Sequence, residues 1–349
     1  MRILITGSSG QIGTNLALRL IEDGHWVFGV DTRPNPWIAE TKTFDTQLQN
    51  LAGHYAPFRG GMDGVPWPDE VDLVIHLAAH AKVHQLVRQP QRALENVMMT
   101  FNILEYCRAL ELPLVFSSTR EVYGDVHRFE ESYGEASADF AYTESPYSAS
   151  KIGSEAFIYS YAKCYGLKYL VFRFSNVYGR YDSDLQRMER VLPLFMHELS
   201  RGSPITVYGG DKKVLDFTYI DDCIDGIVHG VERLVAGAVE NETINLACGQ
   251  GNTLVRAAEL IAGELGVTPE IAHKPSLVGE VTHYVADIAK AHELLGWKPQ
   301  TPLAAGIPLA VDWFRGWRAA HPEEDREIVP ERVPGEIEHA FKPAAVSGA

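Results

Sequence analysis

The sequence predicts an α/β protein in which a doubly wound parallel sheet is joined to a smaller, mostly C-terminal region. Three observations predict this class. Short β-branched runs alternate with helix-length segments, a glycine-rich turn follows the first run, and the pattern changes after about residue 176. At 349 residues, the chain can bury a sizeable core. We expect a sheet domain over 1–176, a smaller region over 177–320 that can return a segment to the sheet, and a mobile tail over 321–349.

The individual elements follow from the apolar pattern. Strands are expected at 3–5, 26–30, 72–76, 114–117 and 169–173. Helices are expected between them at 11–23, 91–111 and 146–165, and later at 190–201, 222–236, 253–266, 287–295 and 303–318. In the tail, Pro330 and Pro334 interrupt any helix and apolar periodicity is lost, which indicates mobility.

Composition excludes several classes of partner. With 31 Lys and Arg against 46 Asp and Glu, the net charge of −15 argues against nucleic acid and anionic membranes. No apolar run approaches the roughly 18 residues of a membrane span. The chain starts without signal-peptide features, and its cysteines lack pairwise spacing, so we expect a cytoplasmic protein. These cysteines are Cys107, Cys164, Cys223 and Cys248.

The glycine-rich turn is typical of a Rossmann-like dinucleotide site. TGSSGQIG at 6–13 spaces Gly7, Gly10 and Gly13 for a tight turn, backbone approach to a pyrophosphate, and close packing of helix on strand. Asp31 ends the second strand, where a carboxylate can bind the adenosine ribose hydroxyls. This carboxylate favours NAD over NADP, although Arg33 nearby leaves NADP open.

SPYSASK at 145–151 carries the expected catalytic pair. Tyr147 and Lys151 are four apart and share a helix face. A free tyrosine ionises near pH 10, and we expect the lysine and the nicotinamide charge to lower that pKa, so that the phenolate removes an alcohol proton. Thr119 follows the strand at 114–117 and can bond the reacting oxygen. Alone, the pair also fits an exposed amphipathic helix; with the glycine turn it indicates catalysis.

Together these motifs resemble the extended short-chain dehydrogenase/reductases, specifically the nucleotide-sugar epimerase/dehydratase branch. The matching segments are TGSSGQIG at 6–13, DLVIHLAA at 72–79, SSTREVYG at 117–124, SPYSASK at 145–151, RFSNVYG at 173–179, LDFTYIDD at 215–222 and ADIAKAHELLGWKP at 286–299. The resemblance implies tightly held NAD, transient oxidation at sugar C4, a nucleotide-diphosphate sugar (UDP-linked) as substrate, and a homodimer formed through 91–111 and 146–165.

The resemblance also assigns site residues. It implies that NAD contacts Gly7, Gly10, Gln11, Ile12, Gly13, Asp31, Leu77, Ala78, Ala79, Asn96, Tyr147 and Lys151. It implies that the substrate contacts Thr119, Asn176, Arg180 and Arg187. No metal site is expected, because His76 ends a strand and cannot share a helix face with His80 and His84.

The residues after Thr119 depart from the family pattern. The 4,6-dehydratases carry an Asp-Glu pair here, in which the Asp protonates the leaving hydroxyl, and Arg120 removes that acid. UDP-glucuronate decarboxylases keep a glutamate at the position of Glu121. Glu121 is therefore either a catalytic residue or a partner of Arg120 and the backbone, and both interpretations stay open.

The usual diphosphate clamp is also altered. Leu215 and Leu277 stand where family members place arginines on the diphosphate. Other cations lie nearby in sequence, and for most of them a solvated surface position is expected. They are Lys212, Lys213, Lys274, Arg180, Arg187 and Arg190.

These observations favour an NAD-dependent nucleotide-sugar 4-epimerase for a UDP-hexose or UDP-hexuronate, acting through a transient 4-keto sugar. The alternative is a UDP-glucuronate decarboxylase or a 4,6-dehydratase that uses Glu121. A catalytically inactive nucleotide-binding scaffold is a third hypothesis, and the retained Thr119, Tyr147 and Lys151 argue against it.

Overall fold

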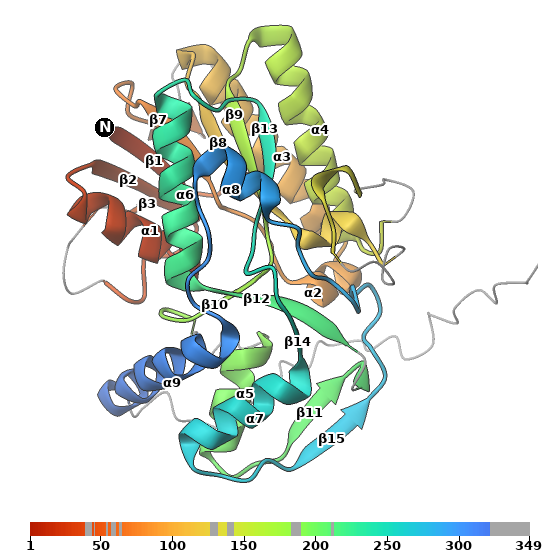
Figure 1. Ribbon diagram of the computed structural model, residues 1–349. Coiled ribbons are helices and arrows are strands. Elements are labelled where there is room, and N and C mark those ends of the chain that lie inside the picture. Colours follow the sequence, from red (N-terminus) through yellow and green to blue (C-terminus); the bar gives the residue numbers. More distant parts are fainter. Residues whose placement is uncertain are drawn as a thin grey trace, which may run out of the picture.

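A large parallel sheet with helices on both faces forms the main body of the protein, as the computed structural model shows (Figure 1). The structure describes residues 1–38, 44, 46–53, 55–56, 61–62, 65–125, 132–137, 143–182, 190–210 and 213–321. The expected tail over 321–349 therefore lies outside the described residues, apart from His321.

The sheet has the strand order β13-β9-β8-β7-β1-β2-β3, and every neighbouring pair is parallel. The order reverses at β1, so the loops after β1 and β7 leave in opposite directions and open a crevice at the carboxyl ends. This confirms the predicted doubly wound fold class. The strands are β1 (Arg2–Thr6), β2 (Trp26–Asp31), β3 (Thr46–Leu48), β7 (Leu73–His76), β8 (Leu114–Thr119), β9 (Tyr169–Phe174) and β13 (Glu242–Leu246).

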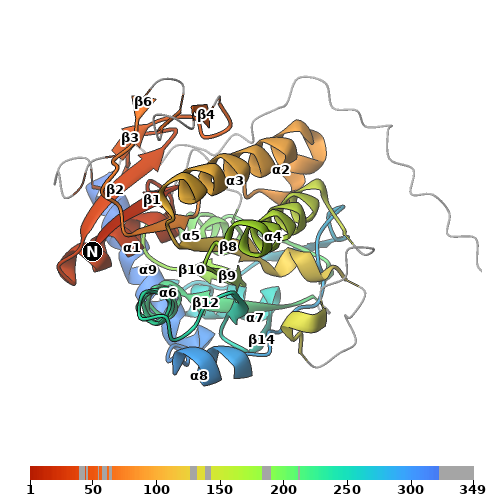
Figure 2. The ribbon, with the colours of Figure 1, turned by 90° about the horizontal axis from the view of Figure 1, so that it is seen from above.

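The two faces of the sheet carry separate cores because strand side chains alternate. On one face, Ile3 and Ile5 pack in the cluster of α1 (Gln11–Glu22) and α6 (Ile220–Val235). On the other, Leu4 packs in the cluster of α3 (Gln91–Leu110) and α4 (Pro146–Tyr165), and Figure 2 shows these helices on opposite sides.

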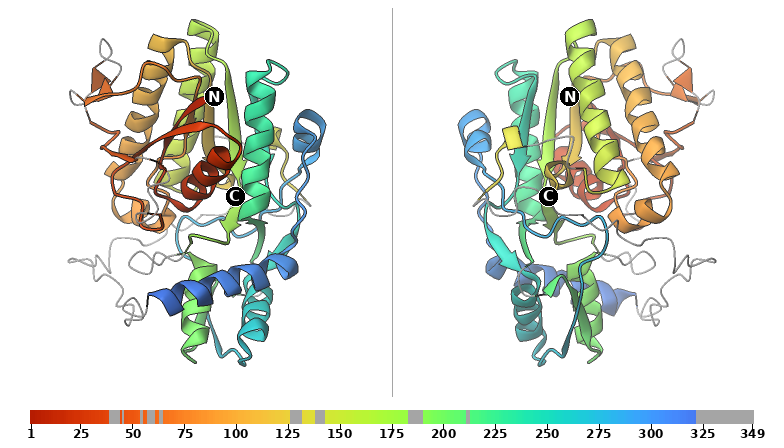
Figure 3. Two further views of the ribbon diagram at one scale, coloured as in Figure 1. Left: turned by 90° about the vertical axis from the view of Figure 1, so that its left-hand side faces the viewer. Right: turned by 90° about the vertical axis from the view of Figure 1, so that its right-hand side faces the viewer.

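A smaller lobe lies beyond the carboxyl ends of the strands (Figures 1 and 3). It contains a β10-β12-β14 sheet, a β11-β15 pair and three helices. Their bounds are β10 (Asn176–Tyr178), β11 (Ile205–Tyr208), β12 (Val214–Tyr219), β14 (Gly251–Thr253), β15 (Ile271–Lys274), α5 (Val191–Ser200), α7 (Leu254–Leu265) and α9 (Leu303–Ala320).

The chain does not divide cleanly between the two lobes. After β12 it returns to the large sheet as α6 and β13, and α8 (Ala289–Leu295) later packs against them.

Within the described ranges, no helix is long and apolar enough to cross a membrane. The remaining elements are α2 (Val83–Arg88), the 3-10 helices η2 (Arg120–Tyr123) and η3 (Glu135–Ser137), and a small sheet of β4 (Tyr55–Ala56), β5 (Gly61–Met62) and β6 (Val65–Pro66).

Candidate active site

The turn between β1 and α1 is shaped to hold a diphosphate. Gly7 has a φ of +72°, a backbone conformation that favours glycine. A Cβ on Gly13 would lie 2.2 Å from the Gly7 oxygen, and one on Gly7 would lie 2.7 Å from the Ala78 nitrogen. Helix α1 starts at Gln11 with no side-chain cap, so its first amides are available to an anion. This cradle fits the pyrophosphate of a dinucleotide.

Asp31 lies at the carboxyl end of β2 and is tied to the same turn. Its Oδ2 accepts the Ser9 amide at 3.0 Å, and its Oδ1 accepts the Thr32 amide at 2.7 Å. Arg33 reaches back to the Ser9 carbonyl oxygen at 3.3 Å. The glycine turn and the carboxylate expected to bind the ribose are therefore held as one unit.

The loop after β7 carries further predicted cofactor residues. The Leu77 amide donates to the Thr6 carbonyl oxygen at 3.1 Å, and the Ala78 amide donates to the Thr6 hydroxyl at 3.2 Å. Buried Asn96 on α3 accepts the His80 amide at 2.8 Å and donates to the His80 oxygen at 3.1 Å. Asn96 thus holds the loop, and its contact with NAD stays a prediction.

Two of the three histidines spaced four apart have different partners. His76 is fully buried, its Nδ1 lies 2.6 Å from the Thr6 hydroxyl, and burial lowers its pKa to about 3. His80 pairs with Glu95 at 2.7 Å. Among the residues that the structure describes, no three His, Cys, Asp or Glu side chains are grouped to hold a metal ion.

Helix α4 presents the predicted catalytic pair beside the end of β8. The helix starts sharply, because Ser145 and Ser148 form a capping box and Pro146 occupies the first turn. Tyr147 and Lys151 follow at once and are 7% and 3% exposed. The predicted pair is therefore part of a buried site and not of an exposed helix face.

Three side chains spaced four apart on α4 each hydrogen-bond with one of three consecutive residues at the end of β8. Tyr147 bonds with Thr119, Lys151 donates to the Ser117 carbonyl oxygen at 2.6 Å, and Glu155 accepts from the Ser118 hydroxyl at 2.5 Å. The sequence indicated the first two members of this row. Glu155 was missed, although its spacing from Lys151 was visible.

The expected lowering of the Tyr147 pKa is not found in the protein alone. Burial raises the pKa of Tyr147 to about 12, and the Thr119 hydrogen bond and the Arg190 charge oppose this only in part. Burial lowers the pKa of Lys151 to about 7, while Glu155 raises it. The expectation rested on the lysine charge together with that of a bound nicotinamide, so it stays a prediction for the NAD-bound protein, and burial of the phenol opposes it.

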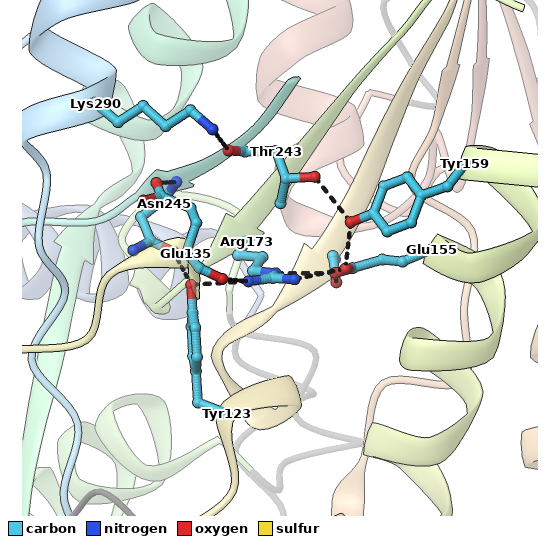
Figure 4. Close-up of polar contacts among 9 residues, drawn as sticks. Tyr123, Glu135, Glu155, Tyr159, Arg173, Thr243, Asn245 and Lys290 are labelled. Atoms are coloured by element: carbon cyan, nitrogen blue, oxygen red, sulfur yellow. Dashed lines mark hydrogen bonds and ion pairs between the residues drawn. The ribbon is translucent and has the colours of Figure 1, made fainter. Parts of the chain in front are cut away.

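Glu155, the third residue of this row on α4, forms a buried ion pair with Arg173 (Figure 4). Two Arg173 nitrogens donate to the two Glu155 oxygens at 3.0 and 2.7 Å, and Tyr159 donates to Glu155 at 2.8 Å. A third Arg173 nitrogen donates to the Tyr123 hydroxyl at 3.2 Å and to the Glu135 carbonyl oxygen at 3.0 Å. The network joins α4, β9, η2 and η3.

A second ion pair follows Thr119 on η2. Arg120 contacts Glu121 at 2.9 Å, and their side chains are 12% and 6% exposed. Burial raises the pKa of Glu121, and the Arg120 charge opposes this rise. Lys213, which precedes β12 in the small lobe, pairs with Glu280 at 2.6 Å. Glu121 was expected to be either a catalytic residue or a partner of Arg120 and the backbone. The structure contains the contact with Arg120, and a catalytic role stays a prediction.

The predicted substrate residues are not all gathered at this site. Asn176 donates to the Asp216 carbonyl oxygen at 2.8 Å within the small lobe. Arg180 is half-exposed and pairs with Asp221 at 2.5 Å on the α1 and α6 side. Arg187 lies outside the described residues.

Of the cations expected at a solvated surface, Lys213 is not there, whereas Arg190 is 50% exposed and still has defined partners. Lys213 is buried, as described above. Arg190, just before α5, donates to the Gln11 side chain at the glycine turn and to Asp182 at 2.7 Å, and its charge acts on Tyr147. Leu215 is buried in β12 and Leu277 is 37% exposed. The contact between Arg190 and Gln11 could not be predicted from the sequence, because the two residues are 179 positions apart.

Comparison with known proteins gives the family. A model of the NAD-dependent epimerase/dehydratase family matches residues 3–247, and the chain belongs to this family. The predicted membership is thereby confirmed. NAD is the family's cofactor, and the cradle around Gly7 and Gly13 fits it.

Individual relatives differ in their reactions. A probable UDP-glucuronate 4-epimerase of Rhizobium meliloti is 31% identical over 92% of this chain and 99% of its own. UDP-glucuronic acid decarboxylase 1 of Xenopus tropicalis is 30% identical over 96% of this chain and 77% of its own. The crystal structure of a UDP-glucose 4-epimerase with UDP-glucose from Thermotoga maritima is 29% identical, with a TM-score of 0.78, over 91% of this chain and 99% of that one.

Proposed function

We propose that the protein is an NAD-dependent nucleotide-sugar 4-epimerase that acts on a UDP-linked sugar through a transient 4-keto intermediate. The observation that carries the proposal is the assembly of Thr119, Tyr147 and Lys151 at the carboxyl end of β8. The small lobe lies over this edge of the sheet, where ligands of doubly wound folds bind.

Each residue has a role in this proposal. Tyr147 removes the proton of the C4 hydroxyl and returns it, while Thr119 bonds the same oxygen and orients it. Lys151 is fixed by the Ser117 oxygen one helical turn from Tyr147. Its protonated form, which predominates below about pH 7, places a positive charge beside the phenol. Bound NAD would supply reversible acceptance of a hydride from C4, which leaves the cofactor unchanged overall. Asp31 and residues 77–79 are proposed to hold it.

Glu121 supports a second candidate function, a decarboxylase or dehydratase. Its carboxylate is buried and close enough to Tyr147 to raise the pKa of the phenol. The ion pair with Arg120 favours epimerisation, because the Arg120 charge stabilises the carboxylate and so makes Glu121 a weaker base toward a carbon acid. Arg120 also stands where an acid would protonate a leaving hydroxyl.

A homodimer formed through α3 and α4 is part of the proposal. Leu94, Met98 and Phe157 on these helices are 70%, 45% and 41% exposed, and Phe157 packs edge-on against Phe101. Large apolar side chains on two adjacent helices are typical of an interface. Sedimentation of Leu94→Glu is expected to give monomers; a wild-type protein that is already monomeric would contradict the dimer. The free cysteines fit a cytoplasmic location, which also stays a proposal.

The test is incubation with NAD and a panel of nucleotide sugars in deuterated water, followed by mass and proton spectra of the products. We expect an isomer without incorporated deuterium, because the hydride returns directly to C4. Loss of water or carbon dioxide, or deuterium at C5, would overturn the epimerase and support a role for Glu121. Tyr147→Phe serves as the inactive control, and absence of any turnover in the wild type would point to a scaffold.

A further inference from the structure

Aromatic side chains gather where the small lobe meets the loop that follows β2. Trp313 and Trp317 on α9 and His321 at its end are spaced four apart, so they share one face of the helix. Their rings form a column, with centroids 5.7 Å apart for Trp313 and Trp317 and 3.7 Å apart for Trp317 and His321. Trp37, from the loop after β2, packs edge-on against Trp313 at 5.8 Å and Trp317 at 4.6 Å. The C-terminal half of α9 accordingly lies on the side of the molecule that carries α1 and β2 (Figures 1 and 2).

Tyr181, which follows β10, joins the cluster from a third segment of the chain. The centroid of its ring lies 5.9 Å from that of Trp37 and 5.6 Å from that of Trp313. Its φ is +58°, in the left-handed region that is unfavourable for a residue with a Cβ and persists only where the surroundings hold it. Three segments of the chain therefore meet in one packed cluster, and this contact fixes their relative positions.

The loop that carries Trp37 is also tied to the glycine turn. Buried Asn35 accepts the Trp37 amide at 2.9 Å, and its Nδ2 donates to the Ser8 carbonyl oxygen at 3.2 Å and to the Thr14 hydroxyl at 2.9 Å. Asp31, at the start of the same loop, bonds with the same turn, as described above. Direct contacts thus run from α9 through Trp37 and Asn35 to the turn that is expected to hold the cofactor diphosphate.

We propose that Trp37 is a positioning residue for NAD: packed against α9, it holds the loop after β2, and with it Asp31 and the glycine turn, in the geometry that binds the cofactor. A loop that is held in place before NAD arrives loses little freedom on binding, so the cluster raises the affinity for NAD. The small lobe thereby contributes to cofactor binding by the large one. The inference rests on the proposed placing of NAD at the glycine turn and Asp31, and it is independent of the reaction that follows.

Binding of NAD in the absence of any sugar tests this proposal. NAD is titrated calorimetrically into wild-type and variant proteins from which bound nucleotide has been stripped with charcoal. We expect Trp37→Ala to weaken NAD binding by about three- to thirtyfold, because the loop loses its packing against α9. Trp317→Ala, on the small-lobe side of the same contact, should weaken it similarly. The double variant should bind NAD about as well as the weaker single variant, since both changes remove one contact.

Two further variants separate this role from general effects of losing a tryptophan. The Nε1 atom of Trp37 is buried and has no hydrogen-bond partner among the described residues, so the indole acts through packing. Trp37→Phe keeps a ring at this place and should retain most of the affinity for NAD. Trp26→Ala is the matched control, because Trp26 is 42% exposed and starts β2 at the end opposite Asp31. Its removal should leave NAD binding unchanged.

Asp31→Ala gives the reference for a residue at the cofactor site itself, and it should weaken NAD by at least about tenfold. If Asp31→Ala is weakened while Trp37→Ala and Trp317→Ala stay within about twofold of the wild type, the positioning role is overturned. Circular dichroism verifies that each variant folds; should Trp37→Ala not fold, Trp317→Ala decides alone. Unchanged binding by Asp31→Ala would refute the placing of NAD, and the inference with it. The reaction is tested separately by product analysis, so failure of the epimerase assignment is distinguishable from failure of this inference.

Discussion

Two buried ion pairs flank the end of β8, and they differ in how completely their hydrogen bonds are satisfied. Glu155 receives both Arg173 nitrogens, Ser118 and Tyr159, so each of its oxygens has at least two donors. Glu121, on η2, leaves one oxygen without a partner among the described residues. The difference teaches that burial of charge alone does not identify a ligand site. A fully satisfied network fixes structure, whereas a partly satisfied one leaves buried polar atoms that cost stability.

Removing Glu155 is the most direct test of the difference between the two ion pairs. We expect Glu155→Ala to lower the free energy of unfolding by about 3–5 kcal/mol, because it leaves the buried Arg173 guanidinium unpaired. Urea denaturation measures this. Arg2→Ala, which breaks the exposed pair with Glu70, is the matched control and should cost no more than about 1 kcal/mol. A loss below about 1 kcal/mol for Glu155→Ala would show that the network is dispensable.

Isosteric changes sharpen the same comparison. Glu155→Gln is expected to reduce stability by about 2 kcal/mol more than Glu121→Gln, since the first weakens several charge-assisted bonds and the second relieves a buried charge that is not fully bonded. Equal losses of stability in the two variants would contradict the view that the Glu155 pair contributes more to stability than the Glu121 pair.

A smaller effect concerns the pH dependence of Lys151, which lies between the two pairs. Its pKa is lowered to about 7 in the fold, so between pH 7 and its ordinary value of 10.5 the unfolded chain holds a proton that the folded protein has released. Stability linked to this group is therefore fully present above pH 10.5 and is lost as pH falls to 7, by at most about 1.4 kcal/mol per pH unit. Relative to Lys151→Met, the wild type should gain stability from pH 7 to pH 9 in urea titrations. A constant difference would contradict the lowered pKa.

Much of the candidate site could be predicted from local signals. The glycine turn, Asp31 and the Tyr147–Lys151 spacing each belong to one strand, turn or helix, so their geometry follows from the local backbone. The Arg173 contact could not be predicted, because Arg173 is on β9 and meets Glu155 only when α4 packs across the sheet. The rise of the Tyr147 pKa could not be predicted either, since burial is a property of the packed molecule.

The sequence by itself determined the order of strands and helices, the cofactor turn and the catalytic pair, because periodicity, glycine spacing and the i, i+4 relation act within a few residues. Only the tertiary structure decided which charged groups meet: Arg120 with Glu121, Lys213 with Glu280, and Arg190 with the glycine turn. The physical reason is that a side chain's partners and desolvation depend on which distant segments pack beside it.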